Sequence, residues 1–196
     1  MSKLADLINA LRQLGRRNLD PVFYAHEVRE RVLDADLERS EWVDLMETFK
    51  GSPSATVSAG IAGALAKHAD LESSPLEVSD LFPFLRLIQL EHKVSRNSAL
   101  AAVQLWMLRT PVESLEESTL KNLIDFLRRS ASQAKDSGSQ ETILEILADF
   151  LFDVEVGDEI FISDVLPIVS ETLTTLTGLG PSSEQMRVEL LENLRD

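Results

Sequence analysis

A short phrase recurs five times along this chain, and its spacing constrains the fold more than any other feature of the sequence. Each copy begins with Asp or Asn, continues with two apolar residues and is apolar again at its sixth position. The intervals between successive copies are 38, 36, 42 and 42 residues, because the copies begin at Asp6, Asp44, Asp80, Asn122 and Asp164. Recurrence at about 40 residues is typical of stacked helical repeats. The chain is therefore expected to fold as a series of similar units.

Two helices are expected in each repeat, because apolar residues recur at helical spacing between start and stop signals. In the first repeat, Leu4, Leu7 and Leu11 share one helix face. Asp20-Pro21 then supplies a cap and a first-turn proline for the second helix. The expected helices cover residues 3–14, 21–35, 37–50, 55–68, 75–92, 95–109, 116–135, 140–154, 158–177 and 182–194.

Several helices carry residues that are unfavourable in a helix interior, and these predict specific tertiary features. Pro83 and Pro167 occupy equivalent positions in the first helices of the third and fifth repeats, and an internal proline kinks a helix. Gly60 and Gly63 lie in an alanine-rich second helix, where each glycine costs about 1 kcal/mol relative to alanine. Close approach of a neighbouring helix is the expected compensation.

These features together resemble the HEAT-type helical repeats, and the resemblance covers nearly the whole chain. It rests on Pro83 and Pro167 in first helices and on Arg96-x-x-Ala99 at the start of a second helix. The small residues between positions 59 and 65 also resemble a second helix of that family. The resemblance implies an all-α fold, a short α-solenoid of about five antiparallel helix pairs, with an irregular multi-helix bundle as the alternative. A single HEAT-like domain is expected over residues 1–196, with approximate units 1–36, 37–70, 74–110, 111–154 and 157–196.

The chain carries a net charge of −14, and this charge is unevenly distributed. Residues 137–196 hold 13 acidic residues against two basic ones, a balance of −11. Residues 1–136 hold 20 acidic and 17 basic residues, a balance of −3. Proteins that bind nucleic acids or anionic lipids usually show the opposite sign. Direct binding to nucleic acid or membrane is therefore not expected, and a protein with a basic surface is the natural partner.

Composition limits the cellular compartment and the types of reactive site that are expected for this chain. The sequence has no cysteine, which excludes disulfides, thiolate nucleophiles and cysteine-ligated metals. Asp6 interrupts the position where a signal peptide would be apolar, and no apolar run is long enough to span a membrane. We therefore expect a cytoplasmic protein.

One group of acidic side chains has a regular spacing that could form a binding surface. Glu141, Glu145, Asp149 and Asp153 are spaced four residues apart on the second helix of the fourth repeat. Residues four apart share one helix face, so the four carboxylates form an acidic stripe. Second helices usually line the concave binding surface of a solenoid. We therefore predict an acidic partner-binding surface, with a solvated face as the alternative; its residues are Glu141, Glu145, Asp149, Asp153, Glu184, Glu189 and Glu192.

The sequence offers little to a catalytic interpretation. His26, His68 and His92 lie in three different repeats, and the zinc-protease pattern that begins at His26 lacks its second histidine. The segment 153–159 is acidic but does not have the ligand spacing of a calcium-binding loop. No catalytic residue, metal or cofactor is predicted.

The expected function is a non-enzymatic protein-interaction module, an acidic adaptor or inhibitor whose concave face binds a basic partner. An immunity protein, an antitoxin or a nucleic-acid mimic would be the most specific form of this role. One alternative is an assembly factor or subunit of a larger complex that binds through apolar surface. A second alternative is a helical-repeat enzyme that acts through carboxylates.

Overall fold

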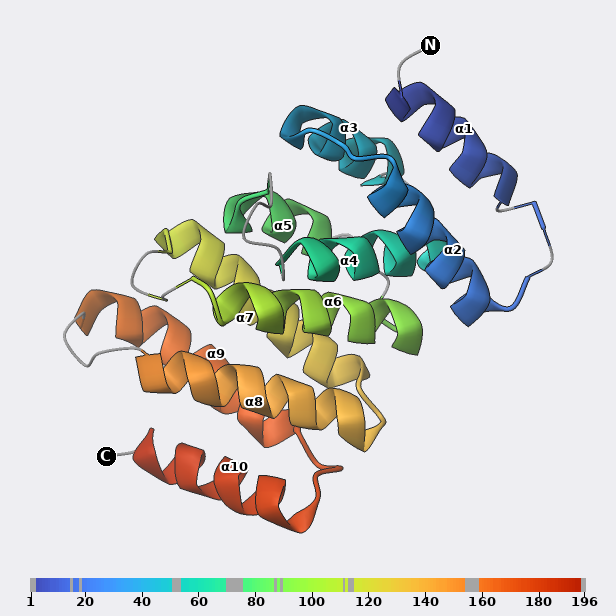
Figure 1. Ribbon diagram of the computed structural model, residues 1–196. Helices are drawn as coiled ribbons and strands as arrows, with labels where there is room; N and C mark the ends of the chain where they lie inside the picture. The colour runs from blue at the N-terminus through green and yellow to red at the C-terminus, as the bar shows by residue number, and fades with distance from the viewer. Residues whose placement is uncertain are drawn as a thin grey trace. The chain divides into compact units, whose positions relative to one another are not determined.

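The computed structural model describes residues 3–14, 16–17, 19–50, 54–69, 76–86, 88, 90–110, 112, 115–153 and 159–194 (Figure 1). Within these ranges the regular secondary structure is helical and no strand is present, which confirms the predicted all-α class. The helices are α1 (Lys3–Leu14), α2 (Pro21–Asp34), α3 (Arg39–Lys50), α4 (Ala55–Ala69), α5 (Val78–Leu85), α6 (Lys93–Met107), α7 (Glu117–Gln133), α8 (Ser137–Asp153), α9 (Glu159–Thr175) and α10 (Pro181–Asn193).

The chain divides into two compact units, Met1–Trp106 with α1 to α6, and Met107–Asp196 with α7 to α10. In unit 1, α1 contacts α2 and α3, α3 contacts α4 and α5, and α2 packs along α4 (Figure 1). In unit 2, α7 contacts α8 and α9, and α10 contacts α8 and α9. Besides the contacts between consecutive helices, odd-numbered helices pack on odd-numbered ones (α1 on α3, α3 on α5, α7 on α9) and even-numbered helices on even-numbered ones (α2 on α4, α8 on α10).

The recurring phrase forms the buried side of the odd-numbered helices. Its second position is buried in every copy, and these residues are Leu7, Leu45, Leu81, Leu123 and Val165. Its sixth position is buried in four copies, at Leu11, Leu85, Leu127 and Val169, and half-buried at Phe49. Burial of a leucine-sized side chain contributes about 1.5–3 kcal/mol. The phrase is therefore a packing signature.

Gly60 allows α4 to approach α2, as the sequence predicts. A Cβ atom at Gly60 would lie 2.4 Å from both Cβ and Cγ1 of Val28 and 2.8 Å from the carbonyl oxygen of Ala25. At Gly63, one turn further along α4, a Cβ atom would meet only the flexible side chain of Arg29, with Cδ at 3.2 Å. The packing of α2 against α4 therefore requires glycine at position 60 and tolerates a larger residue at position 63.

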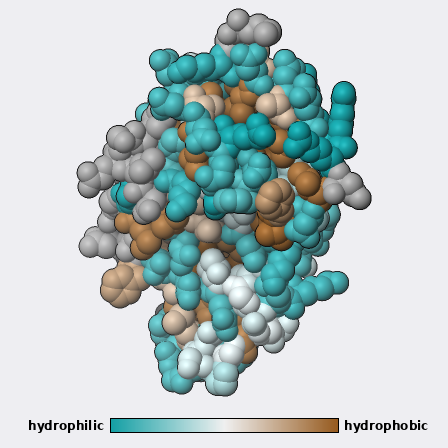
Figure 2. Space-filling model, turned by 45° about the vertical axis from the view of Figure 1, so that its right-hand side comes forward, coloured by the Kyte–Doolittle hydropathy of each residue, from teal (hydrophilic) through white to brown (hydrophobic). Residues whose placement is uncertain are grey.

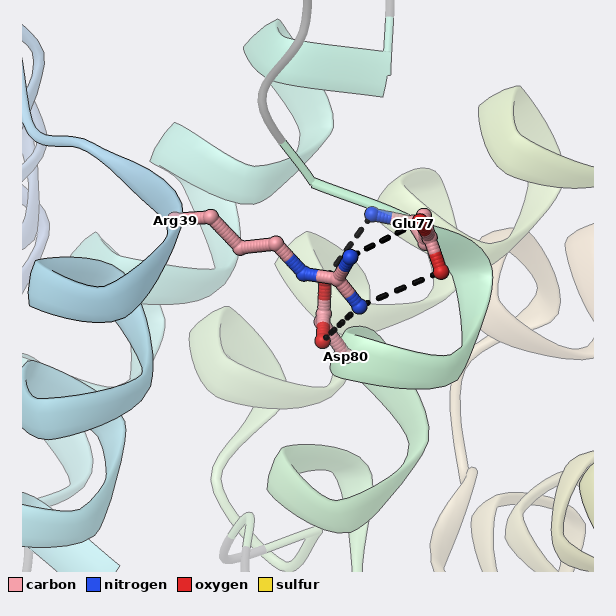
Figure 3. Close-up of polar contacts among 3 residues, drawn as sticks. All are labelled: Arg39, Glu77 and Asp80. Atoms are coloured by element: carbon pink, nitrogen blue, oxygen red, sulfur yellow. Dashed lines mark hydrogen bonds and ion pairs between the residues drawn. The ribbon is translucent and has the colours of Figure 1, made fainter.

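Ion pairs connect successive odd-numbered helices within each unit. Arg39, at the start of α3, donates to Glu77 Oε1 at 2.8 Å and to Asp80 Oδ1 at 3.1 Å (Figure 3). Asp80 also accepts from the backbone N–H of Glu77 at 2.9 Å and so caps α5. In unit 2, Lys121 Nζ of α7 lies 3.3 Å from Asp164 Oδ2 of α9. Asp80 and Asp164 are both the first residue of the phrase, so in these two copies that residue pairs with a cation of the preceding odd-numbered helix.

Two predicted boundaries are wrong, both for reasons of local hydrogen bonding. The helix expected to reach residue 92 ends at Leu85, and Pro83 lies inside this short α5. Beyond it Ile88 and Leu90 are buried outside any helix, and the Arg96 guanidinium donates to the Leu90 carbonyl at 2.7 Å. That carbonyl therefore does not need a helical partner.

The second error concerns the segment 136–139, which was expected to separate two helices. Helix α8 already begins at Ser137. The Asp136 carboxylate accepts from the Ser139 backbone N–H at 3.1 Å and from its hydroxyl at 3.0 Å. These bonds satisfy an N–H of the first turn that would otherwise lack a partner. Ser137, Gly138 and Ser139 therefore form the first turn of α8.

Candidate functional site

The acidic stripe lies on α8, opposite a buried apolar face. Glu145 and Asp149 are exposed, Glu141 is half-buried, and the side chain of Asp153 lies outside the described residues. The buried face consists of Ile143, Leu144, Ile146, Leu147 and Phe150. Helix α8 is therefore amphipathic, and its exposed side carries the predicted carboxylates.

The first turn of α8 holds the connection between α9 and α10. Gln140 is 4% exposed, and its Nε2 donates to the Ala134 carbonyl at 2.8 Å. Its Oε1 accepts from the backbone N–H groups of Thr177 at 2.8 Å and Gly178 at 2.7 Å. Glu141 Oε1 adds a bond from the Gly180 N–H at 3.3 Å. Glu141 therefore has a structural role that the spacing of the stripe did not predict.

The predicted residues of α10 also differ from one another. Glu184 is paired with Arg187, whose Nε donates to Glu184 Oε2 at 2.9 Å. This pairing lowers the pKa of Glu184 and raises the pKa of Arg187. Glu189 is exposed and accepts from Gln185 Nε2 at 2.9 Å, and Glu192 is exposed. Because α8 and α10 are in contact, the exposed members of the predicted set lie on neighbouring helices; they are Glu145, Asp149, Glu189 and Glu192.

Unit 1 contains a shallow groove that the sequence did not predict. Its volume is about 260 Å³, and it is formed by three successive even-numbered helices, α2, α4 and α6. Cationic and small side chains dominate its lining, which consists of Arg29, Gly63, Ala66, Lys67, Ser98, Ala101 and Leu105. Part of this surface has a signal in the sequence, because Gly63 and Lys67 are four residues apart on α4, and Ser98, Ala101 and Leu105 are three and four apart on α6.

The histidines do not form a metal site. In the part of the chain that the structure describes, no group of three or more His, Asp or Glu residues could hold a metal ion. His26 Nδ1 lies 2.8 Å from Arg29 Nη2, and His92 is exposed. His68 packs edge-on against Trp42, with ring centroids 4.9 Å apart and an interplanar angle of 87°. His68 Nδ1 is buried without a hydrogen-bond partner among the described residues, and burial lowers the pKa of this imidazole.

The half-buried His68, with its buried Nδ1, predicts acid sensitivity in unit 1. Its pKa in the folded chain lies below the ordinary value of 6.5, so the unfolded chain binds a proton first as the pH falls. We expect the urea midpoint of unit 1 to be constant above about pH 6.5 and to decrease below it. Tryptophan fluorescence measures this midpoint, because Trp42 and Trp106 both lie in unit 1.

Two variants test this assignment. His68→Leu should remove the decrease just below about pH 6.5, whereas His92→Gln, at an exposed position, should retain it. An unchanged pH dependence in His68→Leu would assign the effect to other groups.

Comparison with known proteins adds no relative: no family model, curated protein or solved structure matches the chain. Among the described residues, every helix is too short or too polar to cross a membrane.

Proposed function

We propose that this chain is a non-catalytic protein-binding module, built as a short HEAT-like α-solenoid, whose exposed carboxylates on α8 and α10 bind a basic partner protein. The packing of odd-numbered helices on odd-numbered helices, and of even on even, supports the solenoid within each unit. An irregular multi-helix bundle is the alternative arrangement. In the solenoid, α8 and α10 are second helices, which usually line the binding surface.

The main support for this proposal is the amphipathic character of α8. One side buries five large apolar residues, while Glu145 and Asp149 stand exposed on the other side. A basic partner would be attracted to these carboxylates, and complementary charge accelerates association. An adaptor and an inhibitor would both use such a surface.

The test is a selection of random peptides displayed on phage against the immobilised full chain. We expect enrichment of peptides rich in Lys and Arg. The variant Glu145→Lys/Asp149→Lys should bind the enriched peptides at least about tenfold more weakly, measured by fluorescence anisotropy of the labelled peptides. The affinity should also fall as salt is added, because exposed charges are screened.

A matched control changes the net charge equally at another exposed place. Asp44→Lys/Glu47→Lys alters two exposed carboxylates of α3, and we expect it to leave the affinity nearly unchanged. An equal loss in both variants would mean that the peptides respond to net charge alone. Enrichment without basic peptides would contradict the proposal directly.

Exposed apolar side chains favour a second candidate, a subunit that binds through apolar surface. Phe152, near the end of α8, is 90% exposed, and Met186 and Val188 of α10 are exposed as well. On the face drawn in Figure 2, hydrophilic side chains cover most of the surface and apolar ones form separate patches. Binding through these residues would survive high salt and would be lost in Phe152→Ser, whereas binding through the carboxylates would show the opposite pattern.

A further inference from the structure

The groove formed by α2, α4 and α6 differs in charge from the rest of this acidic protein. Arg29 and Lys67 both line it, and the lining contains no carboxylate. The groove lies wholly within unit 1, and the acidic stripe lies in unit 2. Its ligand must therefore be sought separately from the basic partner proposed above.

Arg29 retains donors for a ligand. Its Nε and Nη2 donate to Glu30 Oε1 at 2.9 and 2.8 Å, and Nη2 also contacts His26 Nδ1. A guanidinium has five N–H donors, and Nη1 has no partner among the described residues. Lys67 is exposed and pairs with no described residue. Together with the Ser98 hydroxyl, these groups give the groove donors from three helices.

The packing of α2 against α4 does not require a glycine at position 63, beside Arg29. A Cβ atom there would meet only the Arg29 side chain, at 3.2 Å from Cδ, 3.6 Å from Cγ and 3.9 Å from Cβ. Glycine in a helix interior is nevertheless less favourable than alanine. Unlike Gly60, Gly63 is not required for the packing of α2 against α4. Its effect is to keep the groove open next to a cation.

The size of the groove selects the kind of ligand. Sites for drug-sized ligands and cofactors usually occupy about 300–1,000 Å³ and enclose most of the ligand. This groove is smaller, at about 260 Å³, and it is open to solvent. Small or apolar residues form much of its lining; they are Gly63, Ala66, Ala101 and Leu105. These dimensions suit a side chain of a passing polypeptide, with its backbone lying over the small residues.

We propose that the groove between α2, α4 and α6 binds an acidic segment of a partner protein, with a carboxylate held between Arg29 and Lys67. Ser98 adds a neutral hydrogen bond, and apolar neighbours of the acidic residue pack on Ala66, Ala101 and Leu105. An acidic side chain complements the two cations, and its methylene groups match the apolar residues of the lining. An inorganic phosphate group would match only the cations.

The experiment uses random peptides displayed on phage and selected on the full chain carrying Glu145→Gln/Asp149→Asn, so that the stripe on α8 contributes neither carboxylates nor cations. We expect enrichment of peptides that carry Asp or Glu beside an apolar residue. Fluorescence anisotropy should show at least about tenfold weaker binding for Arg29→Gln/Lys67→Gln, since hydrogen bonds to charged groups are the strong ones. Gly63→Leu should block the groove and weaken binding without removing a charge.

The matched control is Arg12→Gln/Arg31→Gln, which removes two exposed cations, one on α1 and one on α2, that do not line the groove. Its affinity should equal that of the parent chain. Three results would overturn the proposal: enrichment without acidic residues, equal weakening in Arg12→Gln/Arg31→Gln, or displacement of the peptide by millimolar inorganic phosphate alone. Because the stripe is already neutralised in the parent chain, none of these results bears on the basic partner of α8 and α10.

Discussion

Gly60→Ala is expected to destabilise unit 1 by about 2–3 kcal/mol, although helix propensity alone predicts a gain of about 1 kcal/mol. The added methyl group would lie 2.4 Å from Val28 Cβ and 2.8 Å from the Ala25 carbonyl oxygen. Val28 is fully buried, and the Ala25 oxygen belongs to the backbone, so neither can move without displacing α2. The substitution should therefore separate α2 from α4 and lower the urea midpoint measured by tryptophan fluorescence.

Gly63→Ala provides the matched control on the same helix. Its methyl group would meet only the Arg29 side chain, which can rotate away. We expect this variant to be neutral or to be stabilised by up to about 1 kcal/mol. If both variants gained stability, the close packing of α2 against α4 would be contradicted. If both lost stability equally, a general intolerance of larger residues in α4 would explain the result.

The repeat pattern could be predicted because it is encoded locally. Every copy of the phrase places an apolar residue at its second position, and burial of Leu45, Leu81 and Leu123 follows from helical spacing alone. The glycine at position 60 was informative for a similar reason, since an unfavourable residue inside a clear helix pattern requires a tertiary compensation. Periodic apolar residues and unfavourable helix residues can both be interpreted from a single segment of the sequence.

The remaining features depend on side-chain contacts that periodicity does not indicate. Arg96 donates to the Leu90 carbonyl six residues earlier, and Gln140 accepts from the backbone at residues 177 and 178. Neither contact leaves a periodic trace in the sequence. The same limit applies to the candidate sites, because Glu141 and Glu145 are equivalent in spacing but differ in burial. The groove could not be predicted, because Arg29 and Lys67 come from different helices and line one surface only in the folded structure.

The two proposed surfaces have opposite charge, so they are expected to bind partners of opposite charge. A basic protein would be attracted to unit 2, where residues 137–196 hold 13 acidic and two basic residues. An acidic segment would not bind that surface, because like charges repel, and would instead bind the groove of unit 1, where Arg29 and Lys67 offer donors. Salt should weaken both interactions, because exposed charges are screened.

Gln140→Ala is expected to destabilise unit 2 by about 2–4 kcal/mol, because one buried side chain satisfies three backbone groups. Truncation removes the donor to the Ala134 carbonyl and the acceptor for the N–H groups of Thr177 and Gly178. A buried group without a partner costs about 1–3 kcal/mol. Thr177 and Gly178 are exposed, so water can reach their N–H groups in part, whereas Ala134 is buried. The Ala134 carbonyl should therefore account for most of the loss.

The measurement combines urea unfolding by far-ultraviolet circular dichroism with hydrogen exchange at Thr177 and Gly178, since unit 2 contains no tryptophan. Exchange at both amides should accelerate in Gln140→Ala. Gln140→Glu keeps the acceptor oxygens but places a carboxylate against the Ala134 carbonyl, so it should protect the two amides and still lose stability. The control is Gln185→Ala, which removes only an exposed bond to Glu189 and should change stability little. If Gln140→Ala were as stable as this control, the connection between α9 and α10 would not depend on α8.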